Sequence, residues 1–136
     1  MKIVLLEGLG VSDAVIEGHA KRLAEMGHTF AAYEKETDPE VQCMRSRDAD
    51  IIMLANMPLH ASVVKEAAKL KFIDVAFTGV DHIPMEEAKK RGIAVSNASG
   101  YATQAVAELS IGFMIQLLRH VKETEQRCRT GGTKDG

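Results

Sequence analysis

Short apolar runs recur along the chain, and each of the first four is followed by a longer segment whose apolar residues have helical spacing. The runs predict five strands, at residues 3–6, 29–33, 51–54, 72–77 and 93–95. Because apolar residues are continuous within each run, we expect a parallel sheet with helices on both faces. The pattern therefore predicts an α/β fold, in which ligands bind beyond the carboxyl ends of the strands.

Four helices are expected between the strands, because capping residues and glycines mark their ends. Ser12 is suited to cap a first helix that stops at Gly27, a residue type that favours helix termination. Thr37 and Glu40 have the spacing of a capping box at the start of a second helix. The third and fourth helices are expected at residues 60–69 and 84–92.

Residues 103–121 break this alternation and predict one long helix, with Thr103 placed to cap it. Apolar residues occur on nearly every side of this helix: Val106, Leu109, Ile111, Phe113, Met114, Ile115 and Leu118. Such a helix is buried on several sides, so we expect it to be covered by chain beyond these 136 residues or by another subunit. Residues 130–136 are polar and predict a flexible end.

The composition is that of a globular protein of about one domain, with 136 residues, 46% of them hydrophobic, and a net charge of −2. This charge gives no reason to expect nucleic acid or an anionic membrane as a partner. The first apolar run ends at Glu7, too soon for a signal peptide, and the apolar stretch 105–118 is too short to span a bilayer. Cys43 and Cys128 lie far apart, so we expect reduced thiols and a cytoplasmic protein.

Two patterns that would bind phosphate are incomplete. A Gly-Leu-Gly sequence at residues 8–10 starts a dinucleotide fingerprint, but its third glycine is replaced by Asp13, which would repel a pyrophosphate. An ordinary strand-to-helix turn is therefore favoured. Residues 50–58 resemble the phosphorylated strand of a receiver domain, but that strand ends at Leu54 instead of an aspartate. Glu7 is the only acidic residue after the first strand, so the magnesium site is also incomplete.

The loop at residues 77–82 is a candidate anion site, because Gly79 lets the backbone approach a ligand and free N–H groups attract anions. A tight turn with Asp81 capping the next helix is an alternative, and both can hold. His82 is interpreted as a surface or capping histidine, and Glu108 as a carboxylate that bonds loop backbone instead of transferring protons. The sequence has no Ser-His-Asp arrangement and no metal-ligand spacing.

Three segments together resemble the D-isomer-specific 2-hydroxyacid dehydrogenases. They are Phe-Thr-Gly-Val-Asp-His-Ile at residues 77–83, Gly-Ile-Ala-Val-Ser-Asn at 92–97 and Gly-Tyr-Ala-Thr-Gln-Ala-Val-Ala-Glu-Leu at 100–109. Their order and spacing also fit the family, and the Val-Ala-Glu of the last segment is the most specific feature. The resemblance covers essentially the whole chain.

The resemblance implies a domain organisation. Residues 1–100 would form a flavodoxin-like, doubly wound substrate-binding domain, and residues 101–136 an interdomain helix and the start of an NAD-binding domain. In the family, the helix matching 103–121 crosses between domains and packs at the dimer interface, which implies a homodimer and explains why the helix is apolar all round.

The resemblance also implies site residues. Backbone N–H groups at Thr78 and Gly79 would hold the substrate carboxylate. The loop Ala55-Asn56-Met57 would form a wall of the site, Tyr101 would lie near the substrate and Thr103 near the nicotinamide. The residue matching Glu108 is usually structural in the family.

The implied reaction is reversible hydride transfer between NAD or NADP and C2 of a small D-2-hydroxy or 2-oxo acid. The family's Gly-x-Gly-x-x-Gly motif and its catalytic arginine, glutamate and histidine match no residue of this chain and are expected beyond it, so we expect the isolated chain to be inactive. The alternative is a stand-alone flavodoxin-like binding module that dimerises through residues 103–121. The coding sequence after Gly136 would distinguish the two.

Overall fold

The computed structural model describes residues 1–132, which belong to two compact units. The first unit is Met1–Ser99, and the second begins at Gly100. Within the described residues, no helix is both long enough and apolar enough to cross a membrane.

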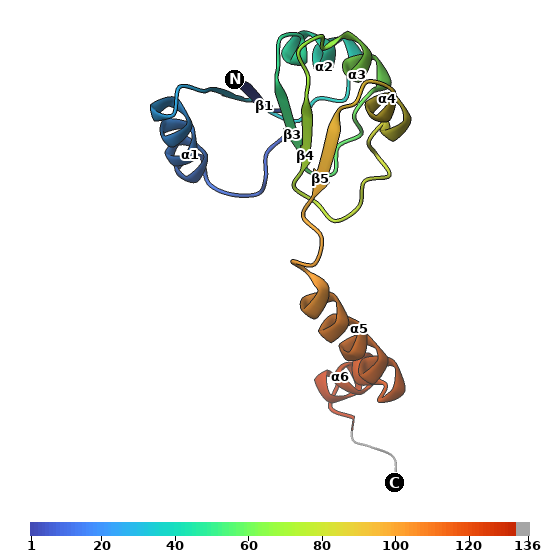
Figure 1. The fold of residues 1–136 in the computed structure, drawn as a ribbon. Helices are drawn as coiled ribbons and strands as arrows, with labels where there is room; N and C mark the ends of the chain where they lie inside the picture. The colour runs from blue at the N-terminus through green and yellow to red at the C-terminus, as the bar shows by residue number, and fades with distance from the viewer. Residues whose placement is uncertain (133–136) are drawn as a thin grey trace. The chain divides into compact units, whose positions relative to one another are not determined.

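The first unit is built on a sheet of five parallel strands: β1 (Lys2–Leu5), β2 (Thr29–Ala32), β3 (Ile51–Leu54), β4 (Phe72–Val75) and β5 (Ala94–Asn97). Figure 1 shows β1, β3, β4 and β5 side by side, and the full order is β2-β1-β3-β4-β5. The predicted α/β fold with five strands is confirmed. In this order the connections reverse direction between β1 and β3, which is where ligands bind on doubly wound sheets.

Helices cover the two faces of the sheet unequally. Helices α2 (Pro39–Ser46), α3 (Ala61–Glu66) and α4 (Met85–Lys90) contact one another in sequence and form one layer, whereas α1 (Asp13–Glu25) lies apart from them in Figure 1. Alternate strand residues join the core with α3 and α4: Ile52, Leu54, Ile73 and Val75. The side chains between them line an apolar hollow of about 630 Å³ beside α1: Ile51, Met53, Phe72 and Asp74.

The helix ends differ in part from the prediction. The capping box of Thr37 and Glu40 is wrong, because Asp38 is the N-cap of α2 and its Oδ1 accepts the N–H of Glu40 at 2.8 Å. Pro39 at the first helical position fixes this start. Ser12 is the N-cap of α1 without a side-chain bond, and Gly27 has φ +77° after that helix, as expected.

The second unit contains α5 (Thr103–Leu118) and α6 (Val121–Arg129). The prediction of one helix over 103–121 is wrong at its end, because His120 adopts a left-handed conformation with φ 50° and separates the two helices. Thr103 is not the cap of α5 either, since Ala102 holds that position. Of the predicted flexible end at 130–136, residues 133–136 lie outside the described part of the chain.

Helix α5 exposes apolar side chains all round, and none of its residues is buried. More than half of each of these side chains is accessible: Val106, Leu109, Ile111, Phe113, Met114, Ile115, Leu117 and Leu118. Exposed apolar surface on this scale is unusual for a monomer. The expectation that this helix is covered by further chain or by another subunit therefore stays a prediction.

Candidate functional site

Glu7 lies directly beyond β1 at the carboxyl edge of the sheet, and it is only 3% exposed. Its Oε1 atom accepts hydrogen bonds from the backbone N–H groups of Ala55 and Met57, at 2.8 and 2.7 Å. Lys35 Nζ lies 3.7 Å from the other carboxylate oxygen. A buried carboxylate is tolerated when it is hydrogen-bonded and paired in this way. Glu7 therefore links the end of β1 to the loop that follows β3.

The loop after β3 is held by two further side chains. His82 Nε2 lies 2.9 Å from the carbonyl oxygen of Ala55, and since a carbonyl only accepts, this nitrogen donates. Buried Gln42 donates to the carbonyl of Pro58 at 3.1 Å and accepts the N–H of His60 at 3.1 Å. These bonds join α2 and the β4–α4 loop to the loop after β3. The loop after β3 is therefore held in place at the carboxyl edge of the sheet.

The loop after β4 presents unused backbone donors. Among the described residues, the N–H groups of Thr78, Gly79 and Val80 have no hydrogen-bond partner. Asn97 Nδ2 donates to the carbonyl of Thr78 at 2.6 Å, which turns that carbonyl toward β5. A Cβ atom built on Gly79 would meet nothing within 4 Å, so the approach to this backbone is open. Consecutive free N–H groups at an open edge form a site for an anion.

The predicted site residues of the first unit are therefore brought together. Ala55, Asn56 and Met57 form one loop, Thr78 and Gly79 belong to the next, and His82 bonds the two loops to each other. Asp81 does not cap α4, whose N-cap is Pro84. His82 is neither a surface residue nor a cap, because it is partly buried and bonds another loop.

The predicted residues of the second unit are Tyr101 and Thr103. Tyr101 is exposed, and Thr103 is the first residue of α5. The prediction that Glu108 bonds loop backbone is wrong, because Glu108 is exposed and its Oε1 accepts from Gln104 Nε2 at 2.8 Å on the same helix. The four-residue spacing of this pair places both side chains on one side of α5.

Sequence reasoning gave no role to Glu7 or to Gln42. The available signal for Glu7 was a carboxylate placed immediately after a buried strand, where an unsatisfied charge would be costly. Gln42 carried no such signal, since glutamine is common on exposed helix faces. The contacts of both residues cross between elements that are distant in sequence.

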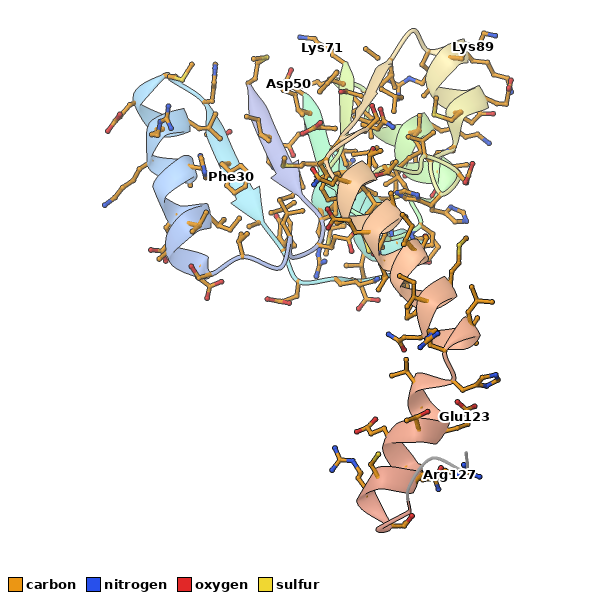
Figure 2. The ribbon with its side chains drawn as sticks, turned by 90° about the horizontal axis from the view of Figure 1, so that it is seen from below. Phe30, Asp50, Lys71, Lys89, Glu123 and Arg127 are labelled. Carbon is orange, nitrogen blue, oxygen red and sulfur yellow. The ribbon has the colours of Figure 1, made fainter. Side chains whose placement is uncertain are left out.

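Outside this edge, Asp50 and Asp74 have pKa values shifted in opposite directions. At the opposite edge of the sheet, Asp50 accepts the N–H of Lys2 at 2.8 Å and lies 3.4 Å from Lys71 Nζ. Figure 2 shows Asp50 and Lys71 side by side. The bond from Lys2 and the charge of Lys71 hold the pKa of Asp50 below its usual range. Burial beside α1 instead raises the pKa of Asp74. No group of three metal-ligating side chains occurs in the described residues.

Comparison with known proteins identifies the family. Residues 9–134 match the family described as D-isomer specific 2-hydroxyacid dehydrogenase, catalytic domain, and the chain belongs to this family. A glycerate dehydrogenase of Methylorubrum extorquens is 35% identical over 104 residues, which are 76% of this chain and 33% of that protein. A hydroxypyruvate reductase of Blautia hydrogenotrophica is 29% identical over 133 residues, 96% of this chain and 40% of the relative.

A solved structure of similar fold is the NAD⁺-bound 3-phosphoglycerate dehydrogenase of Entamoeba histolytica. It is 31% identical with a TM-score of 0.72, over 85% of this chain and 38% of that one. The chain thus spans 33–40% of the length of the two curated relatives named above. These relatives are oxidoreductases by name.

Proposed function

We propose that this chain supplies the substrate-binding part of an NAD(P)-dependent oxidoreductase that acts on the CH–OH group of a D-2-hydroxy acid. The observation that carries the proposal is the row of unpaired N–H groups at Thr78, Gly79 and Val80 on an open carboxyl edge. These donors suit a carboxylate, which every 2-hydroxy or 2-oxo acid carries. Asn56 and its neighbours would form the adjacent wall.

When bound, a nicotinamide would supply the hydride chemistry at C2. Oxidation of the hydroxy acid to the 2-oxo acid also releases the hydroxyl proton, which would pass to a base that the described residues do not supply. The turn between β1 and α1 does not fit the dinucleotide, because Asp13 stands in the first turn of α1 where the fingerprint requires glycine. We therefore assign this chain the substrate side, with Tyr101 beside the substrate and Thr103 as the one residue toward the nicotinamide. No proton transfer is assigned to its side chains.

We also propose that α5 mediates a homodimer, as its exposed apolar surface would favour. Sedimentation of the chain should give a dimer. Phe113→Ser, which places a polar group in the middle of that surface, should shift the population toward monomer. A wild-type chain that is monomeric at all concentrations would contradict this part of the proposal.

The substrate proposal is tested by titrating the ¹⁵N-labelled chain with glyoxylate or hydroxypyruvate. The N–H resonances of Thr78, Gly79 and Val80 should shift with saturation at millimolar ligand. Methyl pyruvate, which keeps the 2-oxo group and lacks the carboxylate, should leave them unchanged. Absence of saturable shifts with either acid, or equal shifts with the ester, would contradict the proposal.

A further inference from the structure

The backbone of the loop after β3 is satisfied at every donor except one. The N–H groups of Ala55 and Met57 go to Glu7, that of Leu59 to the carbonyl of His82 at 3.0 Å, and that of His60 to Gln42. Among the described residues, the N–H of Asn56 and its side-chain amide have no partner. Asn56 is also exposed, while Met57 beside it is 1% exposed within the core.

This arrangement has a cause in the spacing of the two bonds to Glu7. One carboxylate oxygen accepts the N–H groups of residues 55 and 57, so Glu7 holds the backbone on both sides of Asn56, which is itself exposed. The side chain of Met57 fixes the loop from the core side. Glu7 therefore fixes the backbone that carries Asn56, although Glu7 is itself too buried to touch a ligand at the edge.

We propose that Glu7 is a positioning residue of the substrate site, which holds the loop at 55–57 so that the amide groups of Asn56 face the ligand. That this ligand is a 2-hydroxy or 2-oxo acid rests on the proposed function. The part that concerns the loop depends only on the bonds from Ala55 and Met57 to Glu7. Half-exposed Lys35 lies beside the other carboxylate oxygen of Glu7 and balances its negative charge.

The first measurement is hydrogen exchange of individual amides in the 136-residue chain. In Glu7→Ala, the amides of Ala55 and Met57 should exchange about tenfold faster, while core amides such as that of Ile73 keep their rates. Glu7→Gln keeps the accepting Oε1 atom and should retain most of the protection. Glu34→Ala removes an exposed glutamate and is the matched control. Should Glu7→Ala fail to fold, Glu7→Asp tests the same two hydrogen bonds from Ala55 and Met57, because its side chain is one methylene shorter.

The second measurement is the glyoxylate affinity of the same variants, read from the shifts of Thr78, Gly79 and Val80. Glu7→Ala should raise Kd at least severalfold, and Glu7→Gln and Glu34→Ala should stay close to wild type. Unchanged exchange at Ala55 and Met57 would overturn the proposal, as would faster exchange with unchanged affinity. If wild type binds no 2-oxo acid, the proposed function fails, and the exchange rates still decide whether Glu7 holds this loop.

Discussion

His82 donates from Nε2 to the carbonyl oxygen of Ala55 across 2.9 Å, and this bond joins the loops after β3 and β4. The backbone carbonyl of His82 also accepts the N–H of Leu59, so His82 makes two hydrogen bonds to the loop after β3. The two loops that carry the candidate substrate residues are thereby held as one surface at the carboxyl edge of the sheet.

Replacing His82 should loosen this surface. His82→Ala leaves the Ala55 carbonyl without its donor and should lower the free energy of unfolding by about 1–2 kcal/mol, measured by urea denaturation. The amides of residues 55–57 should also broaden in ¹⁵N spectra. His19→Ala, at an exposed position of α1, should change the free energy by less than about 0.5 kcal/mol. Equal effects of the two substitutions would argue against a special role for His82.

Gly79 should matter for binding and not for folding. Nothing lies within 4 Å of a Cβ atom at Gly79, and its φ is not positive, so Gly79→Ala should change stability by less than about 0.5 kcal/mol. The added methyl group would nevertheless stand beside the free N–H groups and should weaken glyoxylate binding about tenfold, because a carboxylate must approach them closely.

Gly18→Ala is the matched control for that substitution. Gly18 lies within α1 with open space around it, so alanine there should raise the free energy of unfolding by up to about 1 kcal/mol. Glyoxylate affinity should stay the same. A loss of stability in Gly79→Ala comparable to the loss of binding would mean that the methyl group disturbs the loop itself.

Asp50 should stabilise the fold only while it is ionised. Its pKa is lowered in the folded state by the bond from Lys2 and the charge of Lys71, so its contribution is present above the unfolded pKa and is lost as pH falls through the folded one. Asp50→Asn should therefore be less stable than wild type at neutral pH, and the difference should shrink below about pH 4. A difference that is constant with pH in denaturation experiments would contradict this. Glu25→Gln, without an ion pair among the described residues, is the control.

Asp74, unlike Asp50, should destabilise the fold when it is ionised. Burial raises its pKa, so its charge disfavours the folded state, and stability is lost as pH rises through the unfolded and then the folded pKa. Asp74→Asn should be more stable than wild type at neutral pH, and this gain should vanish in acid, where Asp74 is itself protonated. Thermal unfolding of both proteins at several pH values measures this difference in stability. A less stable Asp74→Asn at neutral pH would indicate a cation partner for Asp74.

Helix ends were predictable only to within about three residues, for local reasons: α3 ends at Glu66 instead of residue 69, and α5 ends at Leu118 instead of residue 121. Thr37 and Asp38 both carry a side chain that can cap α2, and Pro39 decided between them because its ring suits the first helical position. The break after Leu118 could not be predicted from a glycine or proline, since neither occurs there. It depends on the left-handed conformation of His120, which is uncommon for any residue other than glycine and which the apolar periodicity does not reveal.

The sequence by itself determined the five strands and the parallel α/β fold, because continuous apolar runs and their spacing are properties of neighbouring residues. It also indicated the loops of Ala55 and Gly79, since the carboxyl ends of parallel strands lie at one edge. Only the tertiary structure decided how that edge is held together. Glu7 meets Ala55 and Met57 across 48 and 50 positions, and a contact between such distant residues leaves no trace in the local pattern of either segment.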